Sequence, residues 1–237
     1  MALSNELIFI LIALADLSVI IGCWKYGGKA WLEMIIILNY VVCFFTLAKF
    51  TNIFGMSATI GAIFYAAIYL GTDIITEHFG KKAGQSLIKK AFGAIIFVNV
   101  AIQVMLLVTP DVNSLAVHES MLTVYQGSTR VVIASLFVFL IVQNWDIWVY
   151  HWIHEKTQGR MLWLRNLAST ASAQMLDTFL FFGLAFYGVI ANELLFDIAV
   201  SALIIKLMIA VIDTPFIYLS YWVKGIPLYK ARDIPHN

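Results

Sequence analysis

Seven apolar runs dominate the 237-residue sequence, and each is long enough to cross a membrane as a helix. A spanning helix needs about 20 mostly apolar residues. The runs cover residues 6–24, 31–50, 57–78, 90–109, 128–151, 164–190 and 196–222. Because these runs use up most of the chain, we predict a single integral membrane domain over residues 1–237. Its predicted fold is an all-α, polytopic helical bundle of seven spans.

The composition supports a membrane protein and excludes several other classes. Hydrophobic residues make up 62% of the chain and charged residues 12%, whereas soluble domains carry roughly 45–50% and about 25%. The net charge of +1, with no basic patch, predicts no nucleic-acid partner. Cys23 and Cys43 lie in apolar runs and are interpreted as small core residues. The sequence contains no known catalytic, nucleotide-binding or zinc motif, so we predict no enzyme activity, cofactor or metal.

The basic residues predict the orientation of the chain. Cytoplasmic loops of membrane proteins are enriched in Lys and Arg. The loops around residues 51–56, 110–127 and 191–195 contain neither. Twelve of the fifteen basic residues fall on the opposite side: Lys25, Lys29, Lys81, Lys82, Lys89, Lys90, Lys156, Arg160, Arg165, Lys224, Lys230 and Arg232. We therefore expect a multi-pass membrane protein with the N-terminus outside and the C-terminus in the cytoplasm.

Four predicted spans also carry polar side chains at helical spacing. An ionised residue at mid-membrane costs at least ~2.5–3.5 kcal/mol, so such residues face a bundle interior or a water-filled cavity. We expect the four stripes to converge on a solvated or ligand-filled cavity, with polar contacts that merely join helices as the alternative. The stripes comprise Asn39, Thr46 and Lys49; Tyr65, Tyr69 and Asp73; Gln143, Asp146 and Tyr150; and Asn166, Thr170, Gln174 and Asp177.

The depth of each polar residue follows from the helical rise. Asp177 and Lys206 fall at a similar level in the outer half, with Lys206 roughly 15 Å into its span. They are expected to form an ion pair or two sides of one binding site. A second group lies toward the inner ends, near Arg165, and its role as a gate, a proton site or structural pairing stays open. Its members are Asp73, Gln143, Asp146 and Asp213, with Glu77 interpreted as a solvated helix end.

A stretch in the third run resembles a known family. Residues 69–83, YLGTDIITEHFGKKA, resemble the signature of the bacterial queuosine-precursor transporters, a vitamin-uptake-like family. The resemblance covers roughly residues 36–222, and the first span is additional to the six-helix core of that family. It extends to scattered positions that include Arg130, Ser135, Gln143 and Asp146; Arg165, Asn166, Ser169, Ser172 and Asp177; Lys206; and Asn39 with Lys49.

The resemblance implies a multi-pass protein of a bacterial inner membrane that imports a 7-deazaguanine, such as the 7-cyano or 7-aminomethyl precursor of queuosine. It also implies a fold like that of the substrate-binding subunits of energy-coupling-factor vitamin transporters. A guanine-like edge offers two donors that Asp177 or Asp146 can accept, and a tyrosine can stack on the ring. The expected substrate-binding residues are Asn39, Lys49, Tyr65, Tyr69, Asp73, Arg130, Gln143, Asp146, Asn166, Gln174, Asp177 and Lys206.

Other functions remain open at this stage. Seven spans, an outside N-terminus and a lysine in the last span, Lys206, are also the outline of a retinal-type or other seven-helix receptor. A membrane-embedded enzyme is disfavoured because the sequence lacks a catalytic constellation. The expected partners are a nucleobase-like small molecule and the lipid bilayer. The chain acts alone, as a homo-oligomer, or as the binding subunit of an ATP-driven importer whose partner module supplies the ATP.

Overall fold

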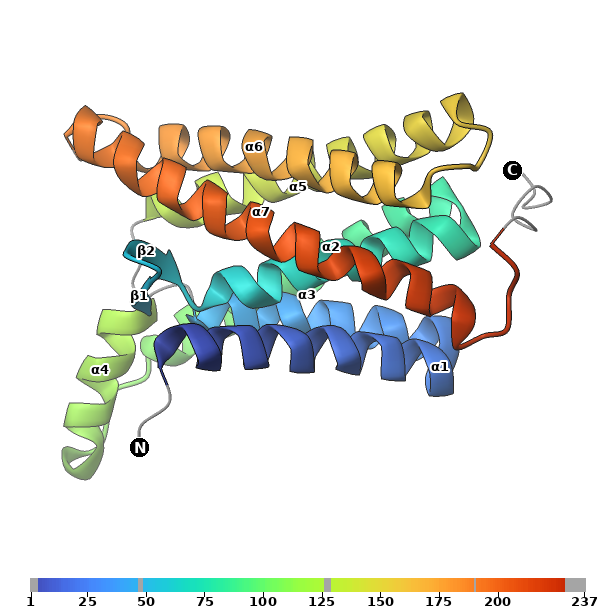
Figure 1. Ribbon diagram of the computed structural model, residues 1–237. Helices are drawn as coiled ribbons and strands as arrows, with labels where there is room; N and C mark the ends of the chain where they lie inside the picture. Colours follow the sequence, from blue (N-terminus) through green and yellow to red (C-terminus); the bar gives the residue numbers. More distant parts are fainter. Residues whose placement is uncertain (1–3, 47–48, 126–128, 190, 229–237) are drawn as a thin grey trace.

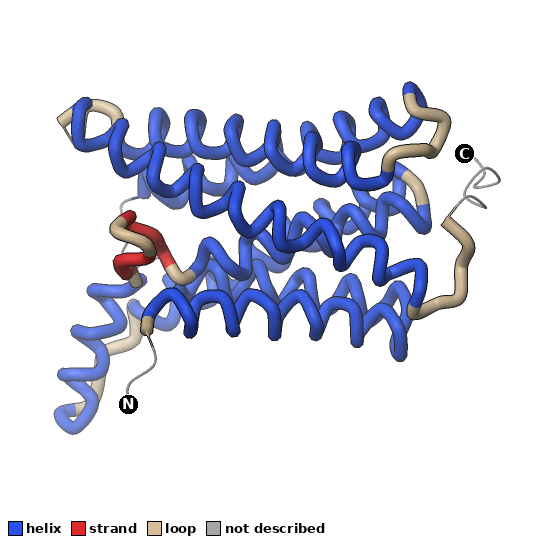
Figure 2. The backbone as a smooth tube through the Cα atoms, in the orientation of Figure 1, coloured by secondary structure: helices blue, strands red, loops and turns tan. Residues whose placement is uncertain are grey.

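The computed structural model describes residues 4–46, 49–125, 129–189 and 191–228, which fold into a bundle of helices with one short β-hairpin (Figures 1 and 2). The all-helical prediction therefore holds apart from the hairpin. The elements are α1 (Asn5–Thr46), β1 (Phe50–Ile53), β2 (Met56–Thr59), α2 (Gly61–Phe79), α3 (Lys81–Leu106), the 3₁₀ turn η1 (Val112–Ser114), α4 (Leu115–Tyr125), α5 (Thr129–Lys156), α6 (Leu162–Phe186) and α7 (Asn192–Trp222).

Helix α1 consists of two arms that reverse direction at Gly28. The backbone of Gly28 has φ 63° and ψ −148°, a conformation that only glycine adopts readily. The Asn39 amide on the second arm donates to Asp16 on the first, at 3.0 and 3.1 Å, so the arms run antiparallel side by side. The predicted runs 6–24 and 31–50 thus correspond to the first arm, residues 5–27, and the second arm, residues 29–46.

The first arm is also fixed to the last helix. The indole of Trp24 donates to the carbonyl of Ser220 in α7 at 2.8 Å and stacks on the ring of His78 in α2, with centroids 4.9 Å apart. Toward the other end of the arm, Phe9 and Ala13 pack with Ile205 and Ile209 of α7. The first arm therefore packs against both α2 and α7.

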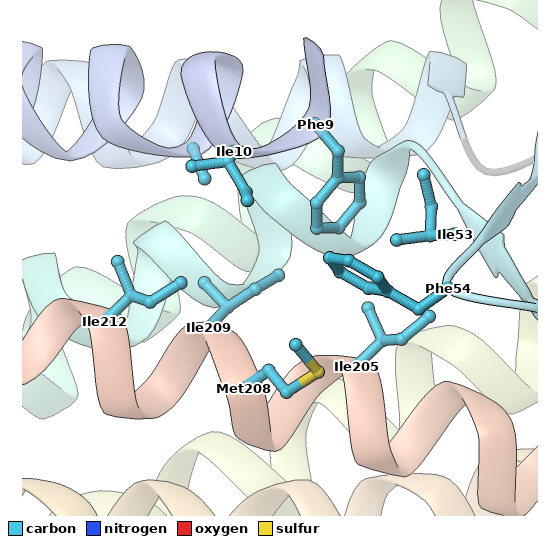
Figure 3. Close-up of a pocket in the computed structure, with 9 residues that line it drawn as sticks. Phe9, Ile10, Ile53, Phe54, Ile205, Met208, Ile209 and Ile212 are labelled. Atoms are coloured by element: carbon cyan, nitrogen blue, oxygen red, sulfur yellow. The ribbon is translucent and has the colours of Figure 1, made fainter. Parts of the chain in front are cut away.

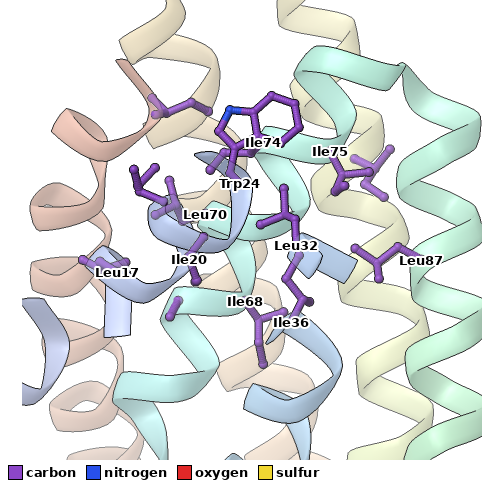
Figure 4. Close-up of a cluster of buried hydrophobic side chains, with 14 of the residues drawn as sticks. Leu17, Ile20, Trp24, Leu32, Ile36, Ile68, Leu70, Ile74, Ile75 and Leu87 are labelled. Atoms are coloured by element: carbon purple, nitrogen blue, oxygen red, sulfur yellow. The ribbon is translucent and has the colours of Figure 1, made fainter. Parts of the chain in front are cut away.

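Helix α2 is the central helix of the bundle (Figure 1). Most of its residues are buried, and its contacts include both arms of α1 together with α3, α5, α6 and α7. Gly71 permits the close approach of the second arm, because a Cβ there would lie 2.4 Å from the Cγ1 atom of Ile36. Figure 4 shows the apolar core that these elements share, formed by residues such as Leu17, Ile20, Leu32, Ile36, Ile68 and Ile74.

Four helical segments of the described chain are long and apolar enough to cross a membrane. They are Asn5–Cys43, which contains both arms of α1, Lys81–Leu106, Arg130–Lys156 and Asn192–Trp222. Helices α2 and α6 are comparably long but less apolar, because their buried faces carry ionisable and amide side chains such as Asp73, Glu77, Arg165 and Gln174. Most of the buried polar side chains of the described residues thus lie on these two helices.

Several predicted boundaries were wrong. The third run was predicted to be helical from residue 57, but Met56–Thr59 is strand β2, which pairs antiparallel with β1. Phe54 and Gly55 connect the strands with φ angles of 53° and 79°, the backbone of a tight hairpin turn. Helix α3 begins at Lys81 rather than at residue 90, because its first turns are charged and precede the apolar run that was used for the prediction. The predicted outer loop 110–127 contains η1 and α4, and α6 ends at Phe186 rather than 190.

Candidate functional site

A row of side chains on one face of α2 forms the centre of a buried polar cluster. Tyr65, Tyr69, Asp73 and Glu77 are spaced by four residues, so they lie one above another on one side of the helix. Their hydrogen-bond partners come from α5, α6 and α7. We call these four residues and the polar side chains around them the polar column, and describe it in three layers from the hairpin end to the opposite end of the bundle.

The first layer contains the predicted pair of Asp177 and Lys206. Lys206 Nζ of α7 donates to Asp177 Oδ2 of α6 at 2.6 Å, and the Tyr65 hydroxyl donates to Asp177 Oδ1 at 2.8 Å. The ammonium also lies 5.2 Å from the centroid of the Tyr65 ring, within cation–π range. Tyr69 extends the layer inward, with its hydroxyl 3.4 Å from that of Tyr65. The ion pair expected from helix depth is therefore confirmed.

Two buried glutamines lie between the first and second layers. Gln174 is one turn before Asp177 on α6, and Gln143 is one turn before Asp146 on α5. Both are fully buried, and their amide atoms have no hydrogen-bond partner among the described residues. A buried polar group without a partner costs about 1–3 kcal/mol. These amides therefore have a strong preference for a polar group, from a ligand or from water, that completes their hydrogen bonds.

Aromatic side chains surround this part of the column. The buried ring of Tyr69 packs against Val138 and Val142 of α5 and Ala173 of α6. Tyr40 of the second arm is also buried and packs edge-on against Phe139 of α5, with ring centroids 4.7 Å apart. The column therefore combines flat aromatic surfaces with carboxylate and amide groups.

The second layer is acidic. Asp73 of α2, Asp146 of α5 and Asp213 of α7 are all fully buried. Asp213 Oδ1 accepts a hydrogen bond from Asn166 Nδ2 at 2.9 Å. Asp146 lies near Asp73 and Ser169, but its carboxyl oxygens and those of Asp73 have no hydrogen-bond partner among the described residues. Four helices thus contribute to this layer, as the sequence predicted for residues toward the inner ends.

The third layer is an ion-pair cluster around Glu77. Arg165 Nε donates to Glu77 Oε2 at 3.0 Å, and its terminal nitrogen donates to Oε1. Tyr150 donates to Oε2 at 2.8 Å and Tyr221 donates to Oε1. The interpretation of Glu77 as a solvated helix end was wrong, because Glu77 and Arg165 are 2% and 1% exposed.

Arg165 lies in the first turn of α6, at the end of the bundle where the sequence placed it, but it is buried. Its first-turn position on α6 points the guanidinium into the bundle, where it also donates to the carbonyls of Gly159 and Arg160 in the loop between α5 and α6. Arg165 thereby joins that loop to Glu77 of the central helix. Its positive charge is paired with Glu77 inside the bundle and is not exposed at the protein surface.

Three of the predicted site residues lie outside the polar column. Asn39 faces the first arm, where it binds Asp16, rather than α2. Lys49 is exposed in the connection to the hairpin. Arg130 is exposed at the start of α5 and donates to the carbonyls of Leu184 and Tyr187, at 2.7 and 2.9 Å, so it caps the end of α6. Because Lys49 and Arg130 are exposed, they do not contribute to the buried column.

The sequence reasoning missed Tyr40, Asp16 and Tyr221. Tyr40 lies four residues after Ile36 on the face of α1 that packs against α2, a spacing that could have indicated it. Asp16 is a single acid within an apolar run, a signal of burial in its own right. Tyr221 falls at the end of an apolar helix, where the sequence gives no indication of a buried partner.

A separate apolar pocket of about 40 Å³ lies near the hairpin end, beside the first layer but lined only by hydrocarbon and thioether side chains. Figure 3 shows Phe9 of α1, Phe54 of the hairpin, and Ile205 and Met208 of α7 converging on it. This volume holds about one water molecule, and the lining offers no hydrogen bond to a polar ligand. The polar column is therefore the candidate functional site.

A column of buried ionisable groups inside a bundle of apolar helices defines a multi-pass membrane protein with a polar interior. Comparison with known proteins identifies which kind of membrane protein this is. A family model described as "Putative vitamin uptake transporter" matches residues 59–220, and the chain belongs to this family. The family resemblance expected from the sequence is confirmed. The chain is a transporter rather than an enzyme, and in a bacterium it resides in the inner membrane.

Two curated relatives are similar to the chain. A protein of Bacillus subtilis (strain 168) named "Probable queuosine precursor transporter" is 28% identical over 217 residues, which cover 91% of this chain and 94% of the relative. A protein of the same name from Haemophilus influenzae (strain ATCC 51907 / DSM 11121 / KW20 / Rd) is 26% identical over 136 residues, covering 57% of this chain and 55% of the relative. No solved structure matches the chain.

Proposed function

We propose that this transporter imports a queuosine precursor, a 7-deazaguanine base, into the bacterial cytoplasm. The names of the two relatives support this substrate class. The observation that carries the proposal is the arrangement around Asp177, where an oriented carboxylate lies beside tyrosine rings and above buried glutamine amides without partners among the described residues.

The first layer suits a guanine-like edge. Such an edge presents two adjacent donors, from the ring N–H and the exocyclic amine. Asp177 already accepts one bond at each oxygen, but a carboxylate has about four lone-pair sites and can accept two more. Gln143 and Gln174 can donate to the ring carbonyl and accept from ring nitrogens. Tyr69 or Tyr40 provides the surface on which a planar bicyclic ring stacks.

We further propose seven membrane crossings with the N-terminus outside. Seven helical segments run in alternating directions along the bundle (Figure 1): the two arms of α1, and α2, α3, α5, α6 and α7. The basic residues Lys29, Lys82, Lys156 and Lys224 lie in or near the connections at the end of the bundle opposite the hairpin. We assign that end to the cytoplasm, with a six-helix core like that of energy-coupling-factor substrate-binding subunits and the first arm as the addition.

The proposal is tested by uptake in cells that cannot synthesise 7-deazaguanines. Such cells, supplied with labelled 7-cyano- or 7-aminomethyl-7-deazaguanine, are expected to regain queuosine in their tRNA only when they express this chain. Asp177→Asn is expected to reduce the labelled queuosine, while Asp197→Asn, at an exposed position of α7, keeps it. Equal queuosine levels with and without the chain, at confirmed expression, would contradict the proposed substrate.

A further inference from the structure

Two carboxyl groups from different helices meet at the centre of the bundle. Asp73 of α2 and Asp146 of α5 are both fully buried and close enough to interact electrostatically. As ionised groups, their four oxygens have no hydrogen-bond donor among the described residues. A hydrogen bond between two carboxyl groups requires a proton on one of them. Two buried acids at this proximity, whose oxygens lack other donors, are therefore suited to hold a proton between them.

No cation in the described chain neutralises this pair directly. Arg165 of α6 is the basic group of the same region, and its guanidinium is bound to Glu77. Lys206 of α7 is paired with Asp177 in the first layer. The other titratable groups that interact with the pair carry negative charge or none: Glu77 and Tyr69 of α2, Tyr150 of α5, Asp213 of α7 and Tyr40 of α1. The buried side chains of α3 include no titratable group.

The electrostatics of such a pair favour one bound proton. Two carboxylates in contact repel each other, and in a buried site this repulsion prevents both from being ionised together. With one proton bound, a hydrogen bond between the two carboxyl groups stabilises the single charge, whereas a second charge would need a counter-ion. The pair is thus suited to bind and release a proton, and it is not arranged as a structural ion pair.

The position of the pair connects it to the candidate substrate site. Asp73 lies eight residues after Tyr65 on the same face of α2, or about 12 Å along the helix axis. Tyr65 holds the Asp177 carboxylate, while Glu77, one turn beyond Asp73, binds Arg165. The pair therefore lies between the layer proposed to bind the base and the ion-pair cluster at the opposite end, on the same central helix as both.

We propose that Asp73 and Asp146 form a proton-binding pair that couples import of the base to the proton gradient. This inference rests on the proposed function. The pair keeps one proton throughout the cycle. It takes up a second proton from the outside together with the base, and releases that second proton to the cytoplasm after the base has left. The ligand of this second site is the proton itself, and the energy source is the gradient across the membrane.

Infrared spectroscopy of the purified protein tests the proton on the pair without any substrate. The C=O stretch of a protonated carboxyl group is distinct from the bands of a carboxylate. We expect this band in the wild type at neutral pH, and a weaker band in Asp73→Asn/Asp146→Asn. Asp111→Asn, at an exposed position before η1, serves as the matched control and keeps the band. Equal bands in the wild type and the double variant would overturn the proposal.

Transport in proteoliposomes tests the coupling. With the interior one pH unit more alkaline, wild type and Asp111→Asn are expected to accumulate labelled 7-deazaguanine up to about tenfold, because a tenfold proton ratio is worth the same free energy as a tenfold substrate ratio. A protonophore abolishes this accumulation. Asp73→Asn and Asp146→Asn are expected to lose the accumulation but to retain exchange of labelled for unlabelled base, which needs no net proton movement.

The other outcomes separate the two proposals. Wild-type transport that ignores the pH gradient overturns proton coupling and leaves the proposed substrate intact. Loss of both exchange and accumulation in the variants, at wild-type protein levels, assigns the pair to base binding and overturns its coupling role. Absence of any transport of the labelled bases overturns the proposed function, and the coupling with it, while the infrared band still decides whether the pair holds a proton.

Discussion

Lys206 Nζ lies 2.6 Å from Asp177 Oδ2, and this contact joins the last two helices of the bundle deep in their apolar length. Both side chains are largely buried, with 13% and 9% of their surfaces exposed. The lysine neutralises the acid and, together with the Tyr65 hydroxyl, fixes its orientation. A carboxylate held in this way presents its remaining lone pairs in a defined direction, which is a prerequisite for recognising a planar ligand.

Replacement of Asp177 by Asn is expected to weaken binding of 7-cyano-7-deazaguanine by roughly tenfold or more. The amide replaces one acceptor by a donor that faces a donor of the ligand, a mismatch of about 1–3 kcal/mol. Calorimetric titration of the purified protein measures the loss. Asp197→Asn makes the same chemical change at an exposed position of α7 and is expected to leave the affinity unchanged. An unaltered affinity in Asp177→Asn would remove this residue from the binding site.

The contributions of Lys206 and Asp177 to binding are expected to be coupled. Lys206→Met leaves Asp177 without its counter-ion, so the acid loses both its charge stabilisation and its orientation. A double-mutant cycle with Asp177→Asn, read as binding free energies, is expected to show an interaction of about 1–3 kcal/mol, the range for residues in direct contact. Simple addition of the two single losses would mean that the lysine acts independently of Asp177.

Glu77→Gln is expected to destabilise the protein more than any single hydrogen-bond deletion around it. Removal of one partner from a buried ion pair leaves the other charge unpaired, at a cost of about 3–5 kcal/mol. Tyr150→Phe removes one of the hydrogen bonds to Glu77 and is expected to cost about 1 kcal/mol. Unfolding of the purified protein in detergent measures both.

The control for Glu77→Gln is Glu119→Gln, on the exposed face of α4. It removes the same charge where water solvates it, and its stability is expected to stay within about 0.5 kcal/mol of the wild type. A Glu77→Gln variant as stable as this control would show that the ion-pair cluster does not hold the four helices together.

The sequence predicted the helices well because membrane burial imposes a simple pattern. Each of the seven apolar runs corresponds to a helical segment, and the break between the first two falls at Gly28. The hairpin was not predictable in the same way. Phe50–Ile53 and Met56–Thr59 are short, and their apolar residues merge with the neighbouring runs. Periodicity cannot separate a short apolar strand from a helix end.

Contacts in the site could be predicted where the depth of two residues in the membrane determines whether they meet. They could not be predicted where the contact depends on how each helix is rotated about its own axis. Asp177 and Lys206 lie on consecutive antiparallel helices at similar depth, so the helical rise brought them together. Glu77 and Arg165 lie near helix ends, where solvation is the usual expectation, and their pairing depends on how α2 and α6 are turned about their axes. Asn39 was misplaced because nothing in the sequence showed that its face of α1 packs against the first arm.

The proposed membrane orientation can be tested with reporters fused to the two ends of the chain. A reporter that is active only in the cytoplasm, fused after Asn237, is expected to be active, and the same reporter before Met1 is expected to be silent. The basis is the distribution of Lys and Arg, which gather at the end of the bundle opposite the hairpin. A silent C-terminal fusion in protein that is inserted and stable would overturn the proposed seven crossings.

Even a methyl side chain at position 28 is expected to destabilise the reversal between the two arms of α1. Its φ of 63° with ψ of −148° places a Cβ atom in steric conflict with its own backbone, so Gly28→Ala is expected to cost about 1–3 kcal/mol of folding free energy. Gly22→Ala provides a matched control within the first arm, where an added Cβ meets no atom within 4 Å. There alanine favours the helix by about 0.5–1 kcal/mol. Thermal unfolding in detergent is therefore expected to shift down for Gly28→Ala and to stay or rise for Gly22→Ala. Equal shifts in the two variants would mean that the arms do not depend on a glycine to reverse.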